Sequence, residues 1–356
     1  MYFILVFILL KSLTQASGDY KYVDFNSACE GGDNIEITSS LHLKDTLNHE
    51  YFLHYDKNDE PCFYKTGLTT PVCETGVCYL VNIELYWDLA GDFIGFDLDN
   101  GELTKLNHEP FTDDDYKKLK DILNNKHWPL ANYPIRNLIV DSTYQVIDEE
   151  VDGYSGATAS FINANDNIPG ALYTVYTLWH HVNNHQLTSQ LKRYTVSILD
   201  HEFLLKMLSS EKAGYQELGL ENLSMLEQLS KNELAHLVKI ILETDAVLAE
   251  KAIEKFPLDN LNEQTILWSA YANASDRIRN SIVQKFSNEE VAVDILLQMS
   301  TYLFQMKSYY SFKKLFDFIC LNADANPVIK KNLKQLLHHE NQFFKREANK
   351  YFARYE

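Results

Sequence analysis

The chain has 356 residues, of which 46% are hydrophobic, and a formal net charge of -18 at pH 7. This apolar content excludes a disordered chain and suffices for one large core or, as we expect, two. The acidic balance argues against nucleic acid or an anionic membrane surface as a partner, because binding to either requires a cationic surface that releases counterions.

The chain begins with a short apolar run from Tyr2 to Leu10, which Lys11 interrupts. A membrane span needs about 20 apolar residues, so this run is too short to be one. Small residues follow at 16–18, in the pattern that a signal peptidase reads. We therefore predict a secretory signal at residues 1–18 and a secreted or periplasmic mature chain without a membrane span. A retained anchor is the alternative.

Five cysteines are consistent with export, and four of them lie in the first quarter of the chain. In an oxidising compartment these four allow three pairings that sequence cannot separate. We favour the local option, Cys73 with Cys78 and Cys29 with Cys62, and the other pairings stay open. Cys73 and Cys78 are also a candidate redox dithiol, although a structural bridge or a free pair is commoner. Cys320 follows apolar residues at helical spacing and is predicted to be a buried thiol.

Residues 19–69 contain short strand-like runs, such as 34–38, and are predicted to form a mixed N-terminal extension. From residue 81 to 87, apolar side chains alternate with Asn, Glu and Tyr in the period of a half-buried strand. A turn at 88–92 then leads to a partner strand at 93–98. The pattern predicts a β-hairpin.

A helix is predicted to begin after Thr112, which is a good N-cap. Three aspartates follow it, where carboxylates interact favourably with the helix dipole. We interpret them as capping groups and not as calcium ligands, because the central glycine and spaced oxygen ligands of a calcium loop are missing. The helix is expected to end near Asn125, and four apolar residues share one of its faces: Tyr116, Leu119, Ile122 and Leu123.

Two further predicted strands, 138–140 and 144–147, lead into a glycine-rich loop that reads Asp152-Gly153-Tyr154-Ser155-Gly156-Ala157-Thr158. Two glycines within four residues allow the backbone to turn tightly and to approach a ligand closely. The final threonine follows a Gly-Ala step, so no bulky neighbour shields its hydroxyl. The loop is therefore predicted to present side chains to a ligand or to another protein.

This segment resembles the attachment motif of FMN-binding domains, Asp-Gly-any-Ser/Thr-Gly-Ala-Thr, and every specified position matches. In that family, found in sodium-pumping quinone reductases and Rnf-type complexes, a separate flavin transferase links FMN to the last threonine through a phosphoester. The resemblance implies that Thr158 is the acceptor. It also implies a recognition frame of five residues: Asp152, Gly153, Ser155, Gly156 and Ala157.

A threonine hydroxyl is a poor nucleophile near neutral pH, so Thr158 is expected to need the transferase's base and metal. Tyr154, Phe161 and Trp87 are candidates to lie against the flavin ring, although core packing explains each of them equally well. The alternative for the whole motif is a glycine-rich turn whose letters match by coincidence.

Beyond the motif, Asn167 is predicted to cap a helix that admits Pro169 in its first turn. About nine residues separate Thr158 from that start, so direct contact between the helix N-terminus and a phosphate is in doubt. The helix ends in His180, His181 and, shortly after, His185. Two histidines four residues apart can share a metal, but no glutamate lies between them and no third ligand is identifiable. We therefore predict rim histidines and no metal.

From about residue 190 glycine and proline almost vanish and helical patterns continue to the end, so a domain boundary is predicted between 186 and 192. Residues 247–256 resemble 278–286, and more loosely 328–337; the first two end 30 residues apart. This recurrence resembles a HEAT-type α-solenoid over about residues 200 to 356. An irregular helical bundle is the alternative.

Together these patterns predict an α+β FMN-binding-like domain at 70–186, followed by an all-α solenoid-like domain at 192–356. The resemblance implies an exported flavoprotein that passes electrons to a redox partner protein. The helical domain would dock the flavoprotein to this partner. No catalytic acid or base beyond the flavin can be named, so we expect a carrier more than a self-sufficient enzyme. The alternative is an extracytosolic α-solenoid binding or scaffold protein with no flavin.

Overall fold

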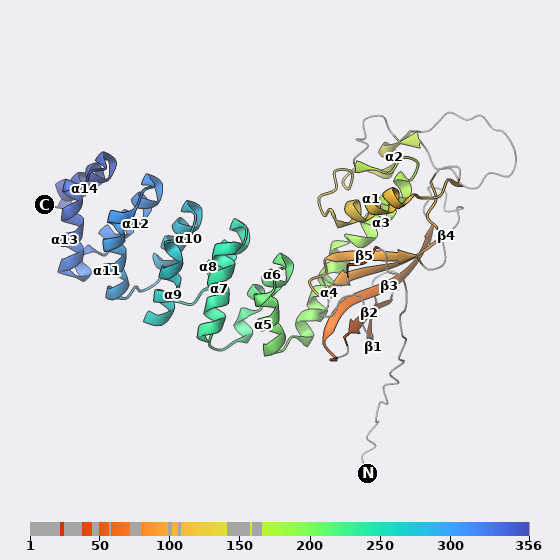
Figure 1. Ribbon diagram of the computed structural model, residues 1–356, viewed down its shortest axis with the longest axis horizontal. Helices are drawn as coiled ribbons and strands as arrows, with labels where there is room; N and C mark the ends of the chain where they lie inside the picture. The colour runs from red at the N-terminus through yellow and green to blue at the C-terminus, as the bar shows by residue number, and fades with distance from the viewer. Residues whose placement is uncertain are drawn as a thin grey trace, which may run out of the picture. The chain divides into compact units, whose positions relative to one another are not determined.

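The computed structural model describes most of the chain, and its contacts divide it into two compact units, Met1–Ile198 and Leu199–Glu356 (Figure 1). The first unit contains an antiparallel sheet with helices, and the second is helical. The described residues are 22–24, 38–44, 50–56, 58–71, 80–98, 102–105, 108–140, 157–158 and 166–355.

The sheet of the first unit has five strands that follow chain order, so each strand pairs with its neighbours in sequence. The hairpin predicted for 81–87 and 93–98 is confirmed. Residues 38–69, however, are not a separate extension, because three further strands of the same sheet lie there. The strands are β1 (Thr38–Lys44), β2 (Glu50–Tyr55), β3 (Pro61–Pro71), β4 (Leu80–Asp88) and β5 (Phe93–Leu98).

Buried and exposed side chains no longer alternate toward the end of β4, because both faces of the sheet are covered there. Leu85 and Trp87 are buried on one face, and Tyr86, on the other, is also buried. Its ring packs against Phe63 of β3 with centroids 5.7 Å apart. Asp88 then closes the turn to β5, since its carboxylate accepts hydrogen bonds from the backbone of Ala90 and Asp92.

The outer edge of β5 pairs with a short N-terminal segment, Tyr22 to Asp24. Val23 forms a β-bridge with Gly95, and Asp24 donates to the carbonyl of Ile94 at 3.0 Å. A Cβ atom at residue 95 would lie 2.2 Å from the carbonyl oxygen of Tyr22. This close approach of two backbones therefore requires the glycine.

Thr112 caps the first helix as predicted. Its hydroxyl accepts from the backbone of Asp115, and the Asp115 carboxylate accepts from the backbone of Thr112. The prediction of a helix start at Asn167 is wrong: the backbone turns at Gly170, where φ is 76°, and α3 begins only at Leu172. The remaining elements of this unit are α1 (Asp113–Asn124), α2 (Ile135–Leu138), β6 (Ile139–Val140), β7 (Ala157–Thr158), α3 (Leu172–Val182) and α4 (His185–Ile198).

Helix α4 belongs to the sheet unit, so the division at Ile198 comes later than the boundary predicted at 186–192. Thr195 is fully buried and donates to the carbonyl of Leu89 at 2.7 Å. Its hydroxyl also lies 2.8 Å from that of Tyr64 on β3. These contacts run from α4 to the sheet. The amino-acid composition changes ahead of the division at Ile198, because a helix that covers a sheet, as α4 does, is as poor in glycine and proline as a helix of a bundle.

The second unit is a row of helices from α5 to α14 (Figure 1). Short 3₁₀ turns follow α6, α11, α12 and α13. The helices are α5 (His201–Ser209), α6 (Ala213–Glu221), α7 (Lys231–Glu243), α8 (Ala246–Lys255), α9 (Leu261–Tyr271), α10 (Asp276–Phe286), α11 (Val293–Tyr302), α12 (Tyr309–Leu321), α13 (Pro327–Gln335) and α14 (Gln342–Tyr355).

The helices form consecutive pairs, and each pair packs on the next. Odd-numbered helices contact the next odd-numbered helix from α5 to α13, and even-numbered helices do the same from α6 to α14. The caps that precede the even-numbered helices recur at a nearly constant interval, with 33, 30 and 33 residues between Lys212, Asp245, Ser275 and Ser308. One continuous core runs through these pairs.

The recurrent phrases only partly follow this pairing. Residues 247–256 and 278–286 fall on α8 and α10, which are equivalent helices of successive pairs. The looser phrase at 328–337 falls on α13, which is the first helix of its pair and not the second. The helix that corresponds to α8 and α10 in the next pair is α12, whose sequence is richer in aromatic residues.

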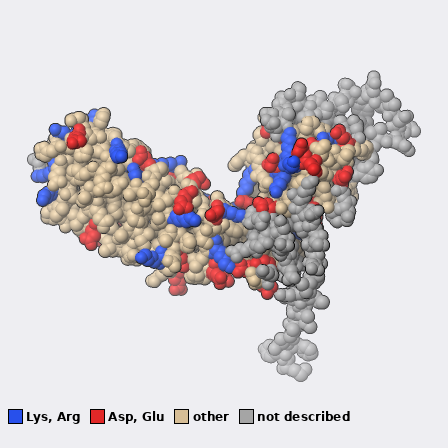
Figure 2. All heavy atoms as spheres, in the orientation of Figure 1, with Lys and Arg blue, Asp and Glu red and all other residues tan. Residues whose placement is uncertain are grey.

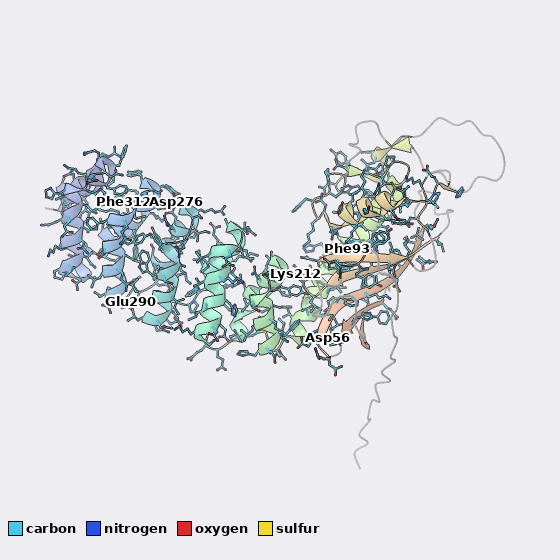
Figure 3. All side chains as sticks on the ribbon, viewed as in Figure 1. Asp56, Phe93, Lys212, Asp276, Glu290 and Phe312 are labelled. Atoms are coloured by element: carbon cyan, nitrogen blue, oxygen red, sulfur yellow. The ribbon has the colours of Figure 1, made fainter. Side chains whose placement is uncertain are left out.

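Buried side chains and hydrogen bonds both join adjacent pairs. The rings of Phe312 on α12 and Phe344 on α14 stack with centroids 3.7 Å apart. Ser311 donates to the carboxylate of Asp276 on α10 at 2.8 Å; Figure 3 labels Asp276 and Phe312 in this part of the row. The Gln264 amide donates to the carbonyls of Leu258 in the α8–α9 loop and Glu290 in the α10–α11 loop.

We expect that Thr195→Val will destabilise the sheet unit by about 1–3 kcal/mol, because the isosteric valine loses the buried hydrogen bond to the Leu89 carbonyl and the contact with the Tyr64 hydroxyl. Urea unfolding of the full chain is the measurement. Replacing Trp268, the tryptophan of the helical unit, with Phe in all variants restricts tryptophan emission to the sheet unit.

The matched control is Thr188→Val on the same helix. Thr188 is partly exposed, and its hydroxyl bonds only locally, to the carbonyl of His185, so its replacement should change stability by less than about 0.5 kcal/mol. Equal midpoints for the two variants would contradict the anchoring role of Thr195.

Candidate functional site

Of the predicted attachment motif, the structure describes the backbone of Ala157 and Thr158. These residues form β7, which pairs antiparallel with β6: Thr158 lies opposite Ile139 and Ala157 opposite Val140. The other motif residues, Asp152 to Gly156, lie outside the described residues, as does Phe161. The backbone of the predicted acceptor is thus held in a two-stranded ladder.

The described chain on both sides of the motif is attached to helix α3. Before the motif, the carbonyl of Tyr133 accepts from the hydroxyl of Tyr176 at 3.1 Å, and α2 and β6 follow directly. After it, the carbonyl of Asp166 accepts from Nε1 of Trp128 at 2.7 Å. Trp128 in turn packs against Tyr176 and Trp179 of α3.

These rings form an aromatic corner, consisting of Trp128, Tyr176, Trp179 and His180. Tyr176 and His180 are closest, with centroids 4.2 Å apart. Burial lowers the pKa of His180, which a hydrogen bond to the Ala131 backbone partly opposes. The Nε2 atom of His180 is buried and has no hydrogen-bond partner among the described residues. The corner therefore contains a neutral imidazole in an apolar setting.

The three histidines near the end of α3 lie on two different helices. His180 and His181 lie at the end of α3, whereas His185 is the exposed first residue of α4. Among the described residues, no group of three or more His, Cys, Asp or Glu side chains could hold a metal ion.

Trp87, a candidate to lie against a flavin ring, is instead a core residue. Its side chain is fully buried, and its Nε1 donates to the carbonyl of Val182 at 3.1 Å. The rings of Tyr51 and Phe93 pack against it edge-on.

The cysteines differ in state between the two units. Cys62 on β3 is buried and disulfide-bonded, and its partner lies outside the described residues, as do Cys29, Cys73 and Cys78. The predicted pairing therefore stays a prediction. Cys320 is a free thiol, partly buried against the core of the helical unit, and burial raises its pKa to about 12. This agrees with its predicted role as a packing residue.

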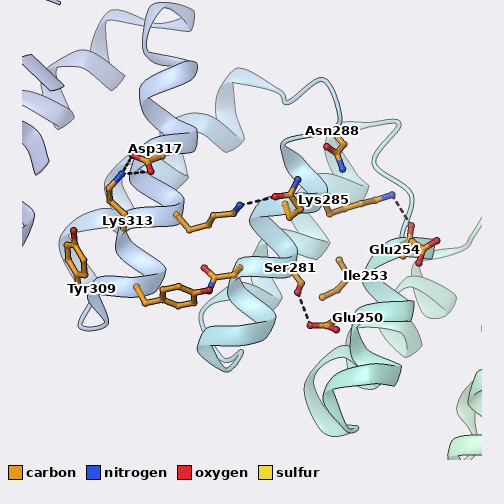
Figure 4. Close-up of a pocket in the computed structure, with 13 residues that line it drawn as sticks. Glu250, Ile253, Glu254, Ser281, Lys285, Asn288, Tyr309, Lys313 and Asp317 are labelled. Carbon is orange, nitrogen blue, oxygen red and sulfur yellow. Dashed lines mark hydrogen bonds and ion pairs between the residues drawn. The ribbon is translucent and has the colours of Figure 1, made fainter. Parts of the chain in front are cut away.

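A second candidate site, which the sequence did not reveal, is a groove on the even-numbered helices of the row (Figure 4). It has a volume of about 680 Å³ and is lined by side chains from α8, α10 and α12. Glu250 comes from α8, Asn280 from α10 and Lys314 from α12. The groove is mixed in polarity. The residues that form it are 67 positions apart at most, and only the stacking of three pairs brings them together, so no local motif could have signalled it.

Charges of both signs surround this groove, and Lys and Arg side chains lie among Asp and Glu on the face shown in Figure 2. Arg277 binds the Glu250 carboxylate through two hydrogen bonds of 2.8 Å, which lowers the pKa of Glu250. Lys313 pairs with Asp317 one turn along α12. Lys285 and Lys314 instead contact neutral oxygens, the carbonyl of Glu254 and the amide of Gln284.

The chain matches no protein-family model, and neither the curated proteins nor the solved structures include a significant match to it. In the described part of the chain, no helix has the length and apolar character needed to cross a membrane. The candidate sites are therefore interpreted from the residues themselves.

One buried titratable side chain in the sheet has a predictable effect on stability. His54 on β2 stacks on Phe63 with centroids 4.8 Å apart, and both of its ring nitrogens are buried without a hydrogen-bond partner among the described residues. Burial, with a smaller contribution from Lys65, lowers its pKa from 6.5 to about 3. The folded chain thus keeps this imidazole neutral at pH values where the unfolded chain protonates it.

We expect that stability will decrease as the pH falls below about 6.5, because the unfolded state then binds a proton that the folded state does not. When the unfolded state binds one proton more than the folded state, the free energy of unfolding falls by about 1.4 kcal/mol for each pH unit. His54 should therefore lower the free energy of unfolding by about 2 kcal/mol between pH 7 and pH 5. His54→Phe should remove this part of the pH dependence while keeping the stacked ring. Urea midpoints measured across this pH range provide the test.

The control is His127→Phe, since His127 is exposed and its replacement should leave the pH dependence as in the original chain. An unchanged slope in His54→Phe would mean that another group causes the acid sensitivity.

Proposed function

We propose that this chain is an exported flavoprotein in which Thr158 carries FMN through a phosphoester and which serves as an electron-transfer module for a redox partner protein. The single observation that carries the proposal is the sequence Asp152 to Thr158, which meets the flavin attachment pattern at every specified position. The disulfide at Cys62 is consistent with an exported chain.

The described residues around the motif fit this role in two respects. The pairing of Thr158 with Ile139 fixes the backbone of the proposed acceptor, so an FMN attached there would start from a fixed point on the chain. The aromatic corner offers the partly exposed rings of Tyr176 and His180 on helix α3, and the chain is attached to this corner before and after the motif. Flat rings of this kind pack well against another flat ring.

The N-terminus of α3 does not add to the fit. Its N-cap is Ala171, which makes no side-chain capping bond, and 14 positions separate Thr158 from Leu172. The chain's own contribution would therefore be to hold the acceptor, to exclude water with the aromatic corner and to supply the neutral His180. When bound, the flavin supplies the electron-accepting and electron-donating chemistry.

The modification state of Thr158 tests the proposal. We expect that the chain, exported from cells that contain a flavin transferase, will show an intact mass higher by one FMN less one water, and yellow fluorescence in a denaturing gel. Thr158→Ala should lose both signals, because the acceptor oxygen is gone.

Ser160→Ala is the matched control, since it removes a hydroxyl two residues away and should keep the full mass increase. An unmodified chain in cells that modify a known flavinylated protein at the same time would contradict the proposal.

The second candidate function is that of an extracytosolic binding or scaffold protein without flavin. It is favoured by the row of paired helices, which resembles a HEAT-type α-solenoid, and by the groove across α8, α10 and α12. Stacked helix pairs present an extended surface that suits a protein partner. This candidate requires no modification of Thr158 and is the alternative to the first.

A further inference from the structure

We infer that the groove across α8, α10 and α12 binds an extended, acidic peptide segment of a partner protein. This inference rests on the second candidate function, that the helical row is a binding surface, and it adds the place and the chemistry of the ligand. Its starting point is the balance of charges in the groove.

Two of the three lining carboxylates have a cation beside them. Arg277 binds Glu250 and Lys313 pairs with Asp317, whereas Glu254 has no ion pair among the described residues. Lys285 and Lys314, by contrast, donate to neutral oxygens at 3.0 and 2.9 Å. Lys314 has no ion-pair partner among the described residues, and Lys285 lies 3.9 Å from a single carboxylate, that of Glu289. The groove of this acidic chain therefore has cationic groups left for an anionic ligand.

One polar group that lines the groove suits a peptide bond. Asn280 on α10 lines the groove, and both atoms of its amide are buried without a hydrogen-bond partner among the described residues. A carboxamide donates and accepts at the same time, as a peptide group does, so one peptide bond can satisfy both atoms. Unsatisfied buried polar groups are rare in native proteins, which favours a ligand here.

A second lining side chain can turn without losing a described contact. Tyr310, on the neighbouring helix α12, also lines the groove and is 69% exposed. It has no ring or hydrogen-bond partner among the described residues, so its rotation breaks no described contact. The adjacent Tyr309, in contrast, is held by a hydrogen bond to Glu347 on α14.

The size of the groove fits a short extended segment. Packed helices lie about 8–10 Å apart, so the path from α8 to α12 is about 16–20 Å long. An extended chain rises about 3.3 Å per residue and covers this path with about five or six residues. The volume of about 680 Å³ accommodates part of such a segment, with its remaining side chains in solvent.

The experiment is selection of a phage-displayed library of random dodecapeptides on the full chain, followed by fluorescence anisotropy with the enriched peptides. We expect acidic sequences to be enriched. Asn280→Leu should weaken their binding at least tenfold and leave the melting temperature equal or higher, because leucine needs no hydrogen bond. Lys314→Glu should weaken binding by a similar factor through charge repulsion.

Lys239→Glu on α7 is the matched control, because Lys239 is an exposed lysine on an odd-numbered helix, and it should bind as the original chain does. Enriched peptides that bind Asn280→Leu and Lys314→Glu unchanged would overturn the groove as the site but leave the row as a binding surface. No enrichment would count against both. Equal competition by inorganic polyphosphate of matched charge would also overturn the inference, since charge alone would then explain binding.

Discussion

The second unit depends on one constraint: no helix pair in it can bury its apolar side by itself. Phe312 illustrates this, since its ring is fully buried only because Phe344 of the next pair stacks on it. Each interface between pairs is therefore a part of the core, and the core is as long as the row. The polar contacts between pairs, such as those from Ser311 to Asp276 and from Arg277 to Glu250, lie at the margins of this core and fix the register in which neighbours meet.

The same constraint explains why a groove exists. Three equivalent helices, α8, α10 and α12, present their outer sides in a row, and unrelated side chains from each meet there. Asn280 and Lys314 have no role in the core, yet the stacking that buries Phe286 and Ile282 on α10 fixes where they lie. A surface of this kind has a rigid backbone and variable side chains, which is the usual arrangement of a recognition surface.

Local signals predicted local structure well. The alternation at 81–87 predicted the β4–β5 hairpin, and Thr112 with its aspartates predicted the start of α1, because each depends on side chains a few residues apart. Features set by distant contacts were missed. Composition could not assign α4 to the sheet, because the partners of Thr195 lie more than 100 residues earlier. Pro169 suggested a helix start at Asn167, but the chain turns at Gly170 and the helix begins at Leu172. Within the motif, the prediction of Thr158 as an acceptor rests on sequence alone, and the structure adds the pairing of its backbone with Ile139.

The distribution of cysteines gives the two units different chemical requirements. Cys62 of the sheet unit forms a disulfide, so this unit reaches its final covalent form only after oxidation. The helical unit contains one cysteine, Cys320, whose raised pKa keeps it a thiol that hardly exchanges with disulfides. The row of helices can therefore fold before the chain is oxidised, and it would stay folded in a reducing agent that breaks the Cys62 disulfide of the sheet unit.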